Sequence, residues 1–312
     1  MITLPHADDR LFLTDGGIET TLIFHEHVEL PCFAAFILLE QDRALLERYY
    51  RRYLAIAGRA GTGFVLESPT WRCSSDWGEK LGLDAARIFA LNRDAIGLMH
   101  ELRTAHERAQ PGAGPVVVSG CVGPRGDGYD PGLAMTADEA EAYHGAQIAA
   151  LREARADMVT AITMTSTPEA IGIARAAGEA GLPVVLSFTL ETDGRLPTGD
   201  TLRKAITDVD LATGGAPAYY MINCAHPTHF AHVLEPGAAW SARVRGLRTN
   251  ASRRSHKELN DSPDLDPGDP HELGAEHRAL LARHPHINVL GGCCGTDHRH
   301  IEQIYSACSG GA

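Results

Sequence analysis

The repeated alternation of short apolar runs with longer amphipathic segments is the feature that most restricts how this chain can fold. Eight runs of five to seven residues have the length and composition of buried β-strands; they cover residues 11–15, 64–68, 116–120, 158–163, 184–189, 219–223, 244–250 and 287–292. The segments between them, such as residues 41–61, 84–109 and 167–183, place apolar residues three and four apart, as amphipathic helices do. Eight strand–helix units predict one α/β domain over residues 1–312, a single (β/α)8 TIM barrel with its active site at the carboxyl ends of the strands.

A doubly wound open sheet is the alternative arrangement of the same elements. Such sheets often carry a Gly-x-Gly-x-x-Gly phosphate loop after the first strand, whereas residues 14–21 read TDGGIETT. The barrel is therefore favoured. One connection is unusual, because residues from about 251 to 272 are polar, rich in Pro and Asp, and too long for an ordinary strand–helix loop. We expect a surface insertion after the seventh strand.

Composition limits the environment and the partners of the chain. The formal net charge of −12 argues against binding to nucleic acid or to anionic membranes. Apolar runs are too short for a membrane span, and the first ten residues lack the features of a signal peptide, so we expect a cytoplasmic protein. Barrels often self-associate, and the sequence leaves a homo-oligomer open.

Three of the seven cysteines fall at predicted carboxyl ends of strands. Cys224 ends the sixth strand in MINCAHP, and Cys293 and Cys294 end the eighth in GGCCGT. In a barrel only one strand lies between the sixth and the eighth, so the three thiols converge on one rim. Three thiolates suit Zn²⁺ and leave its fourth tetrahedral position open, as a catalytic site requires. The sequence therefore predicts an open zinc site.

Other interpretations of the cysteines and histidines remain open at this point. Free buried thiols are the expectation for the remaining cysteines, and a redox pair of Cys293 with Cys294 would strain the chain and leave Cys224 without a role. Histidines spaced by three, and two more after the cysteine pair, offer a rival metal site. No acidic partner completes it, so we interpret these histidines as surface or supporting residues. The residues concerned are Cys32, Cys73, Cys121, Cys308, His226, His229, His232, His298 and His300.

Three segments together resemble the zinc-dependent homocysteine S-methyltransferases, a family that includes betaine and S-methylmethionine enzymes. They are TDGGIETTL near the start, INCAHP after the sixth strand and GGCCGTDHRHI after the eighth, and the resemblance covers nearly the whole chain. It implies a barrel whose Cys224, Cys293 and Cys294 bind zinc. It also implies that Asp15 lies in the homocysteine site, where Gly16 and Gly17 allow the backbone to approach.

The chain departs from the family pattern at three places. Ile162 stands where the family usually has a glutamate that helps to hold the amino group of homocysteine, and Glu19 stands where a glycine is common. The second strand ends in LESPTWRCS instead of a Thr-Asn-Thr-like segment. Glu67 or Glu19 could supply the missing charge. Alternatively, the acceptor is another thiol or a selenol.

The resemblance implies methyl transfer from an onium donor to the homocysteine thiolate, forming methionine, with a small-molecule thiol and a methyl donor as partners. Zinc would lower the pKa of the acceptor thiol, so no protein general base is expected. Two further hypotheses are hydrolysis by zinc-bound water and a non-catalytic zinc- or thiol-binding barrel.

Asn223 is expected to orient the metal site, and Thr70 and Ser119 to line the pocket. An onium pocket is expected to draw on aromatic and acidic residues; candidates are Trp71, Trp77, Tyr129, Glu67 and Asp127. A basic run after the sixth strand is expected to be a solvated face, with binding of a donor carboxylate as the alternative; it comprises Arg243, Arg245, Arg248, Arg253 and Arg254.

Overall fold

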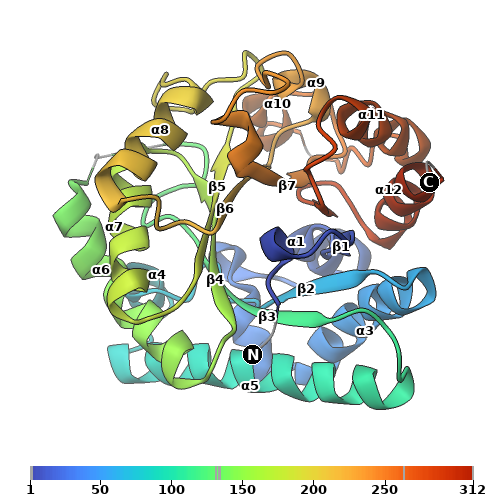
Figure 1. Cartoon of the computed structure of the whole chain (residues 1–312). Coiled ribbons are helices and arrows are strands. Elements are labelled where there is room, and N and C mark those ends of the chain that lie inside the picture. The colour runs from blue at the N-terminus through green and yellow to red at the C-terminus, as the bar shows by residue number, and fades with distance from the viewer. Residues whose placement is uncertain (1–2, 131, 133–134, 263, 311–312) are drawn as a thin grey trace.

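Eight parallel strands close into a barrel in the order β1-β2-β3-β4-β5-β6-β7-β8, with helices packed around them (Figure 1). The computed structural model describes residues 3–130, 132, 135–262 and 264–310. The predicted (β/α)8 barrel is confirmed, and each predicted strand overlaps an observed one. The strands are β1 (Phe12–Leu13), β2 (Gly63–Glu67), β3 (Val116–Val122), β4 (Met158–Met164), β5 (Val184–Thr189), β6 (Tyr219–Asn223), β7 (Val244–Thr249) and β8 (Val289–Gly292).

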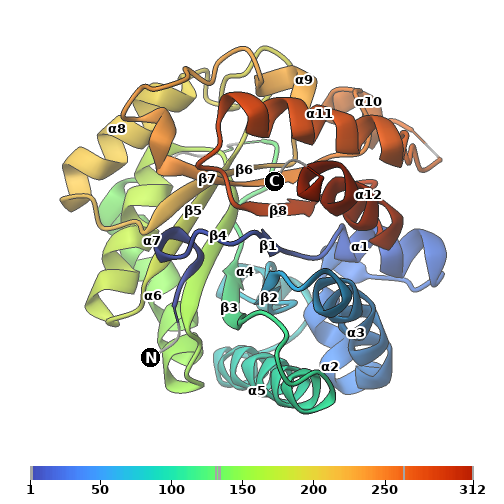
Figure 2. The same cartoon turned by 45° about the vertical axis from the view of Figure 1, so that its right-hand side comes forward.

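Long helices follow seven of the strands, and α12 packs beside α3 to close the ring of helices (Figure 2). The connection after β6 differs, because its only α-helix is the four-residue α9. Pro236 and Gly237 in this connection disfavour a longer helix. The helices are α1 (Ile18–Thr20), α2 (Leu38–Gln41), α3 (Arg43–Ala60), α4 (Ser75–Lys80), α5 (Ala85–Ala109), α6 (Ala137–Glu153), α7 (Thr167–Glu179), α8 (Leu202–Thr213), α9 (Pro227–Phe230), α10 (His256–Asn260), α11 (Pro270–Arg283) and α12 (His298–Ser309).

Local sequence fixes the ends of several helices. The Asp42 side chain accepts a hydrogen bond from Leu45 N at the start of α3, and Gly61 ends that helix in the left-handed conformation. Ser255 and Glu258 form a capping box that starts α10 inside the polar segment after β7. In both views α10 lies beside α9 and α11 (Figures 1 and 2).

The interior of the barrel is layered. Because side chains alternate along a strand, residues two positions apart point to the same side. One apolar cluster fills the interior towards the amino ends of the strands; we call it the lower layer, and it contains Phe12, Val65, Val117, Met158, Val185, Tyr219, Met221 and Val289. Two residues further along the strands stand mostly polar residues, the upper layer: Thr14, Glu67, Ser119, Thr160, Ser187, Asn223, Arg248 and Gly291.

No helix in the described part of the chain is long and apolar enough to cross a membrane.

Candidate metal centre and substrate site

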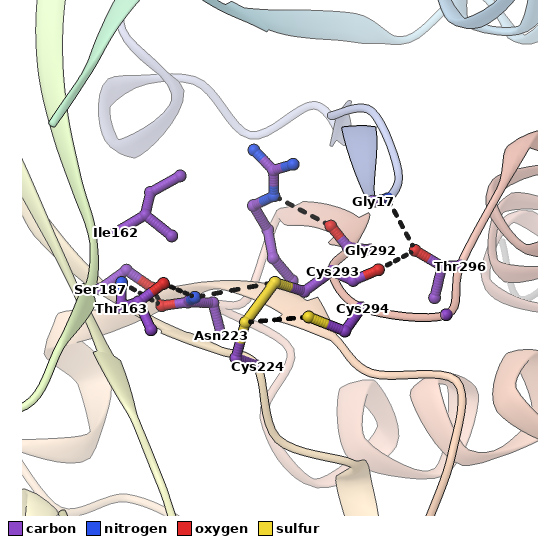
Figure 3. The surroundings of a disulfide bond; sticks show 12 residues. Gly17, Ile162, Thr163, Ser187, Asn223, Cys224, Gly292, Cys293, Cys294 and Thr296 are labelled. Atoms are coloured by element: carbon purple, nitrogen blue, oxygen red, sulfur yellow. Dashed lines mark hydrogen bonds between the residues drawn. A yellow bond between two sulfur atoms is a disulfide. The ribbon is translucent and has the colours of Figure 1, made fainter. Parts of the chain in front are cut away.

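Three cysteine sulfurs meet at the carboxyl ends of β6 and β8 (Figure 3). The Sγ atoms of Cys224, Cys293 and Cys294 all lie within 4.8 Å of one another, with Cys224 buried and the other two half-buried. Among the described residues, this is the only group of three or more His, Cys, Asp or Glu side chains close enough to hold a metal ion. The convergence expected from the order of the strands is therefore present.

Two of these sulfurs are joined in the structure as a Cys224–Cys293 disulfide. The Cα atoms of this pair are 5.4 Å apart, within the range that a disulfide spans. The pair is therefore described in its oxidised form, and its role as two ligands of a metal ion stays a prediction. The bond does not join the adjacent residues Cys293 and Cys294. Free cysteines are Cys32, Cys73, Cys121, Cys294 and Cys308.

The spacing of the sulfurs fits a tetrahedral zinc ion. Zinc–sulfur bonds of about 2.3 Å at tetrahedral angles hold two sulfurs about 3.8 Å apart. The observed separation of Cys224 Sγ and Cys294 Sγ is 3.8 Å. Reduction of the disulfide would release Cys293 Sγ as the third donor, so this donor set can hold zinc in its reduced form.

Backbone contacts hold the cysteine segments in place. Cys224 has a positive φ of 51°, and its N–H donates to the carbonyl of Arg248 on β7. The N–H of Cys293 donates to the Thr249 carbonyl. Gly17 packs directly on this turn, because a Cβ at Gly17 would lie 2.6 Å from the Cys293 carbonyl oxygen. Only glycine permits this approach.

Asn223 ties the neighbouring strands to the cysteines. Its Oδ1 accepts hydrogen bonds from Thr163 N at 2.9 Å and from Ser187 Oγ at 2.6 Å, and its Nδ2 lies 3.9 Å from Cys293 Sγ. Thr163 has a positive φ of 65° beside a register shift between β4 and β5. Asn223 therefore supports an irregular stretch of β4 as well as the segment that carries Cys224.

A buried arginine occupies the centre of the upper layer. Arg248 forms ion pairs with Asp15, at 2.6 Å, and with Glu67, and its Nε donates to the Gly292 carbonyl. Burial raises the pKa of both carboxyl groups, and the arginine opposes that shift. Tyr49 donates a further hydrogen bond to Asp15 at 2.8 Å. Asp15 and Glu67 thus share one protein cation as their ion-pair partner.

The expectation of a solvated basic face is wrong for Arg248, which is 6% exposed. Its inward position on β7, two residues after Gly246, is the signal that could have identified it, because alternation places both residues on the interior side. Other arginines of that run have carboxylate partners nearer the surface: Arg243 pairs with Asp210, and Arg253 with Glu272 and Glu276.

Glu19 is the acidic residue of this region that Arg248 does not hold in an ion pair. It is half-buried in α1, and burial raises its pKa to about 7, with Asp15 adding to that shift and Arg248 and Arg72 opposing it. The next residue, Thr20, accepts a hydrogen bond from Gly295 N at 3.0 Å through its Oγ1, so α1 lies against the segment that directly follows Cys294. Gly16 and Gly17 precede it, and the Gly16 carbonyl accepts a hydrogen bond from Tyr49.

Ile162 presents an apolar side chain beside the site. It is buried on β4, and Figure 3 places it on the same side of the disulfide as Thr163 and Ser187. Nothing in its side chain can accept a hydrogen bond from an amino group.

Thr70 and Ser119, which were expected to line the pocket, form hydrogen bonds to neighbouring strands. Thr70 Oγ1 donates to the Cys121 carbonyl, and Ser119 Oγ shares a hydrogen bond with Thr160 Oγ1, each at 2.7 Å.

The tryptophans expected near an onium donor contact a protein cation instead. The Arg72 guanidinium lies 4.2 Å from the ring of Trp71 and 3.6 Å from that of Trp77, and Lys80 also lies over Trp77. Trp71 Nε1 donates to the Ile162 carbonyl at 3.3 Å. Asp127 is exposed, 3.9 Å from Arg72. The faces of these rings are therefore partly occupied.

The histidines do not form a second cluster. His226 is buried beside Glu276, at 3.2 Å, while His229 bonds to the Arg253 carbonyl and His300 to the Pro267 carbonyl. Burial lowers the pKa of His226 to about 3. These three are buried residues with partners of their own. Of the two interpretations, surface or supporting residues, the surface one is therefore wrong for them.

His256, in the polar segment after β7, was not identified from the sequence. It is buried against Tyr129 with ring centroids 4.1 Å apart, and its Nε2 forms a hydrogen bond with the Cys224 carbonyl. No local pattern distinguishes it from the other histidines, since its position depends on how a long loop packs.

Comparisons with known proteins agree with this geometry. The family model described as homocysteine S-methyltransferase matches residues 12–308. The Homocysteine S-methyltransferase of Escherichia coli strain K12 is 26% identical over 310 residues, 94% of each chain. Crystal structures of the homocysteine methyltransferase MmuM from Escherichia coli are similar in fold. Its oxidized form gives a TM-score of 0.76 at 22% identity and its metallated form 0.75 at 20%, each covering 96% of both chains.

Proposed function

Because this chain belongs to the homocysteine S-methyltransferase family and is a methyltransferase, we propose that it is a zinc-dependent enzyme that moves a methyl group from a small onium donor to the thiolate of homocysteine, forming methionine. The observation that carries the proposal is the meeting of three cysteine sulfurs within 4.8 Å at the carboxyl end of the barrel. The metallated form of the Escherichia coli relative, which has a similar fold, supports the metal assignment.

Cys224, Cys293 and Cys294 would hold the ion once the disulfide is reduced. When bound, zinc supplies a Lewis acid that stabilises the acceptor sulfur as a thiolate near neutral pH. The remaining task of the chain is to position the two substrates in line, since a bound pair reacts far faster than a free one. Asn223 and Gly17 contribute by fixing the two cysteine segments against each other.

We assign the amino group of homocysteine to Glu19. Of the two residues that could supply the charge missing at Ile162, Glu67 is already paired with Arg248, whereas Glu19 is not. A half-buried carboxyl group whose pKa is about 7 gains its charge readily beside an ammonium group, because an opposite charge favours the ionised form. An ion pair between Glu19 and the acceptor would therefore replace the contact that Ile162 cannot make.

A second acceptor class is favoured by Ile162 itself. A thiol or selenol without an amino group would lie against an apolar side chain without loss, whereas a buried unpaired ammonium group is costly. The test of function therefore includes acceptors of both kinds.

The experiment uses the full chain, reduced and loaded with zinc. Each reaction contains one acceptor, either homocysteine or a small thiol that lacks an amino group, together with one methyl-labelled donor. The donors are S-methylmethionine, S-adenosylmethionine, betaine and dimethylsulfoniopropionate, and the labelled product is detected by mass spectrometry. We expect methionine with at least one donor, and none from Cys294→Ser. Cys308→Ser, which removes a half-buried cysteine of α12, is the matched control. Label transferred only to a thiol that lacks an amino group would move the assignment to the second acceptor class. Label transferred to no acceptor would refute the proposed reaction.

A further inference from the structure

Arg72 is a second buried arginine of this region, and its charge lacks a buried partner. It is 4% exposed, as enclosed as Arg248, which is 6% exposed and forms ion pairs with the buried carboxylates of Asp15 and Glu67. Among the described residues, the carboxylate within ion-pair reach of Arg72 is that of Asp127, which is exposed and 3.9 Å away, beyond hydrogen-bonding distance. A buried cation without a close partner costs free energy, so its position needs an explanation.

The hydrogen-bonding groups of Arg72 are also incompletely used. Its Nη1 donates to the Gly126 carbonyl at 2.7 Å, whereas its Nε is enclosed and has no hydrogen-bond partner in the described part of the chain. Burial lowers the pKa of Arg72, and Asp127 opposes that shift. An anion that enters this place would meet a desolvated charge and free N–H donors, both of which strengthen its binding.

Two tryptophans fix the orientation of the guanidinium group. Its central carbon lies 4.2 Å from the centroid of the Trp71 ring and 3.6 Å from that of the Trp77 ring. Aromatic rings stack on the faces of this planar group, and its N–H donors, which point outwards in the plane, stay available for hydrogen bonds. Held in this way, the fork of donors matches the two oxygens of a carboxylate.

The contacts around Arg72 lead to the strand ends beside the metal centre. Trp71 Nε1 donates to the Ile162 carbonyl on β4 at 3.3 Å. A Cβ at Gly128 would lie 3.2 Å from the Trp71 ring and 2.9 Å from the Thr163 side chain, so the three residues pack closely. Ile162 and Thr163 both lie beside the cysteine cluster (Figure 3). Arg72 is therefore part of the wall behind the site.

From this geometry we propose that Arg72 binds a substrate carboxylate. The inference deepens the proposed function and rests on it, because homocysteine and each of the onium donors named above carry a carboxylate group. On binding, that carboxylate takes the place of Asp127, an exposed and distant counter-ion, beside the N–H donors of Arg72. Arg72 lies in the segment LESPTWRCS, where the chain departs from the family pattern, so the assignment is particular to this chain.

Tryptophan fluorescence can follow binding at Arg72, because two of the three tryptophans of the chain pack on its guanidinium group. The third, Trp240, precedes β7 and is removed as Trp240→Phe in every sample. The reduced, zinc-loaded chain is titrated with two pairs of compounds. One pair is homocysteine and the aminothiol that lacks only its carboxylate; the other is S-methylmethionine and the sulfonium amine that lacks only its carboxylate.

Arg72→Gln is expected to weaken binding of the carboxylate-bearing member of one pair roughly ten- to a hundredfold and to leave its carboxylate-free counterpart unchanged. The pair that responds identifies the acceptor or the donor as the source of the carboxylate. Arg72→Lys keeps the charge but loses the paired donors, so it should recover part of the affinity. Arg93→Gln, which removes an exposed ion pair with Glu153, is the matched control and should bind all four compounds as the parent does.

Asp127→Asn provides a test that does not depend on a change at a buried residue. Because it removes a competing charge, we expect it to tighten carboxylate binding by up to about fivefold. Weaker carboxylate binding in this variant would contradict the exchange.

Equal weakening of both members of each pair by Arg72→Gln, or no change for any of the four compounds, would overturn the inference. Binding is measured without turnover. Carboxylate affinity that depends on Arg72 in a chain that forms no methylated product would therefore refute the proposed reaction and keep the carboxylate site. A parent chain that binds neither homocysteine nor S-methylmethionine would overturn the substrate class, and this inference with it.

Discussion

The lower and upper layers of the barrel interior lie two residues apart along each strand, yet their chemistry differs. Val117 belongs to the apolar cluster of the lower layer, whereas Ser119, two residues further along β3, bonds to Thr160. Arg248 with Glu67 places full charges in the same upper layer. Buried polar groups cost free energy unless they are paired, so their presence at one end of the barrel needs a reason beyond stability. This difference indicates that the lower layer stabilises the barrel, whereas the upper layer supports the chemistry of the site.

The largest expected effect on activity comes from the cysteines, which lie at the carboxyl ends of β6 and β8, beyond the upper layer. Cys294→Ser is expected to lower kcat/KM for methyl transfer at least about a thousandfold, because an oxygen ligand holds zinc less well than a thiolate. Steady-state kinetics of the reduced, zinc-loaded protein measures this effect. The account would be wrong if Cys294→Ser kept the activity of Cys308→Ser.

Removing the buried cation should break the upper layer. Arg248→Met leaves Asp15 and Glu67 without their partner and is expected to lower the free energy of unfolding by about 3–5 kcal/mol. Urea denaturation followed by circular dichroism provides the measurement. Arg175→Met, which removes an exposed ion pair with Asp138, is the control and should cost no more than about 1 kcal/mol. Equal losses in both variants would mean that Arg248 is not a buried structural cation.

Acid should destabilise the upper end of β7 through His277. This histidine is fully buried on α11, and its Nε2 lies 3.4 Å from Thr249 Oγ1. Burial lowers its pKa from 6.5 to about 4. Below pH 6.5 the unfolded chain binds a proton that the folded chain excludes until about pH 4. Stability is therefore full above pH 6.5 and falls towards pH 4, by roughly 3 kcal/mol at most. Urea unfolding across this range should show a shallower pH slope for His277→Gln, and an unchanged slope would contradict the assignment.

Shortening a side chain of the lower layer should lower the free energy of unfolding without changing the activity. Val117→Ala removes two buried methyl groups and is expected to cost roughly 2 kcal/mol in the free energy of unfolding, with kcat/KM unchanged. Ser119→Ala, on the same strand in the upper layer, is the matched comparison. A loss of activity in Val117→Ala as large as that in Ser119→Ala would remove the distinction between the layers.

The smallest expected effect concerns the acceptor. Glu19→Gln should raise the KM for homocysteine about tenfold, the equivalent of one charge-assisted hydrogen bond of about 1.4 kcal/mol, and leave unfolding nearly unchanged. Glu26→Gln, an exposed change shortly after α1, is the control. If the KM of Glu19→Gln equals that of the control, the amino group of the acceptor is bound elsewhere.

Much of this site could be predicted from the sequence because barrel topology places strand ends together. The convergence of Cys224 with the adjacent pair Cys293 and Cys294 follows from the order of the strands alone. The disulfide does not follow, since it depends on the positions of individual sulfurs. Nor do the positions of Tyr129, whose hydroxyl lies 3.1 Å from Cys294 Sγ, and of His256, which packs on its ring, because long loops adopt conformations set by distant contacts.

The measurement that tests the account most directly is the zinc content of the purified chain before and after reduction. The account predicts little zinc while Cys224 and Cys293 are joined, and one zinc ion per chain once a thiol reductant has opened the disulfide and zinc is supplied. The same treatment of Cys224→Ser should leave weakly held zinc that a chelator removes. Reduced wild-type protein that binds no zinc would contradict the central claim that the three cysteines form the metal centre.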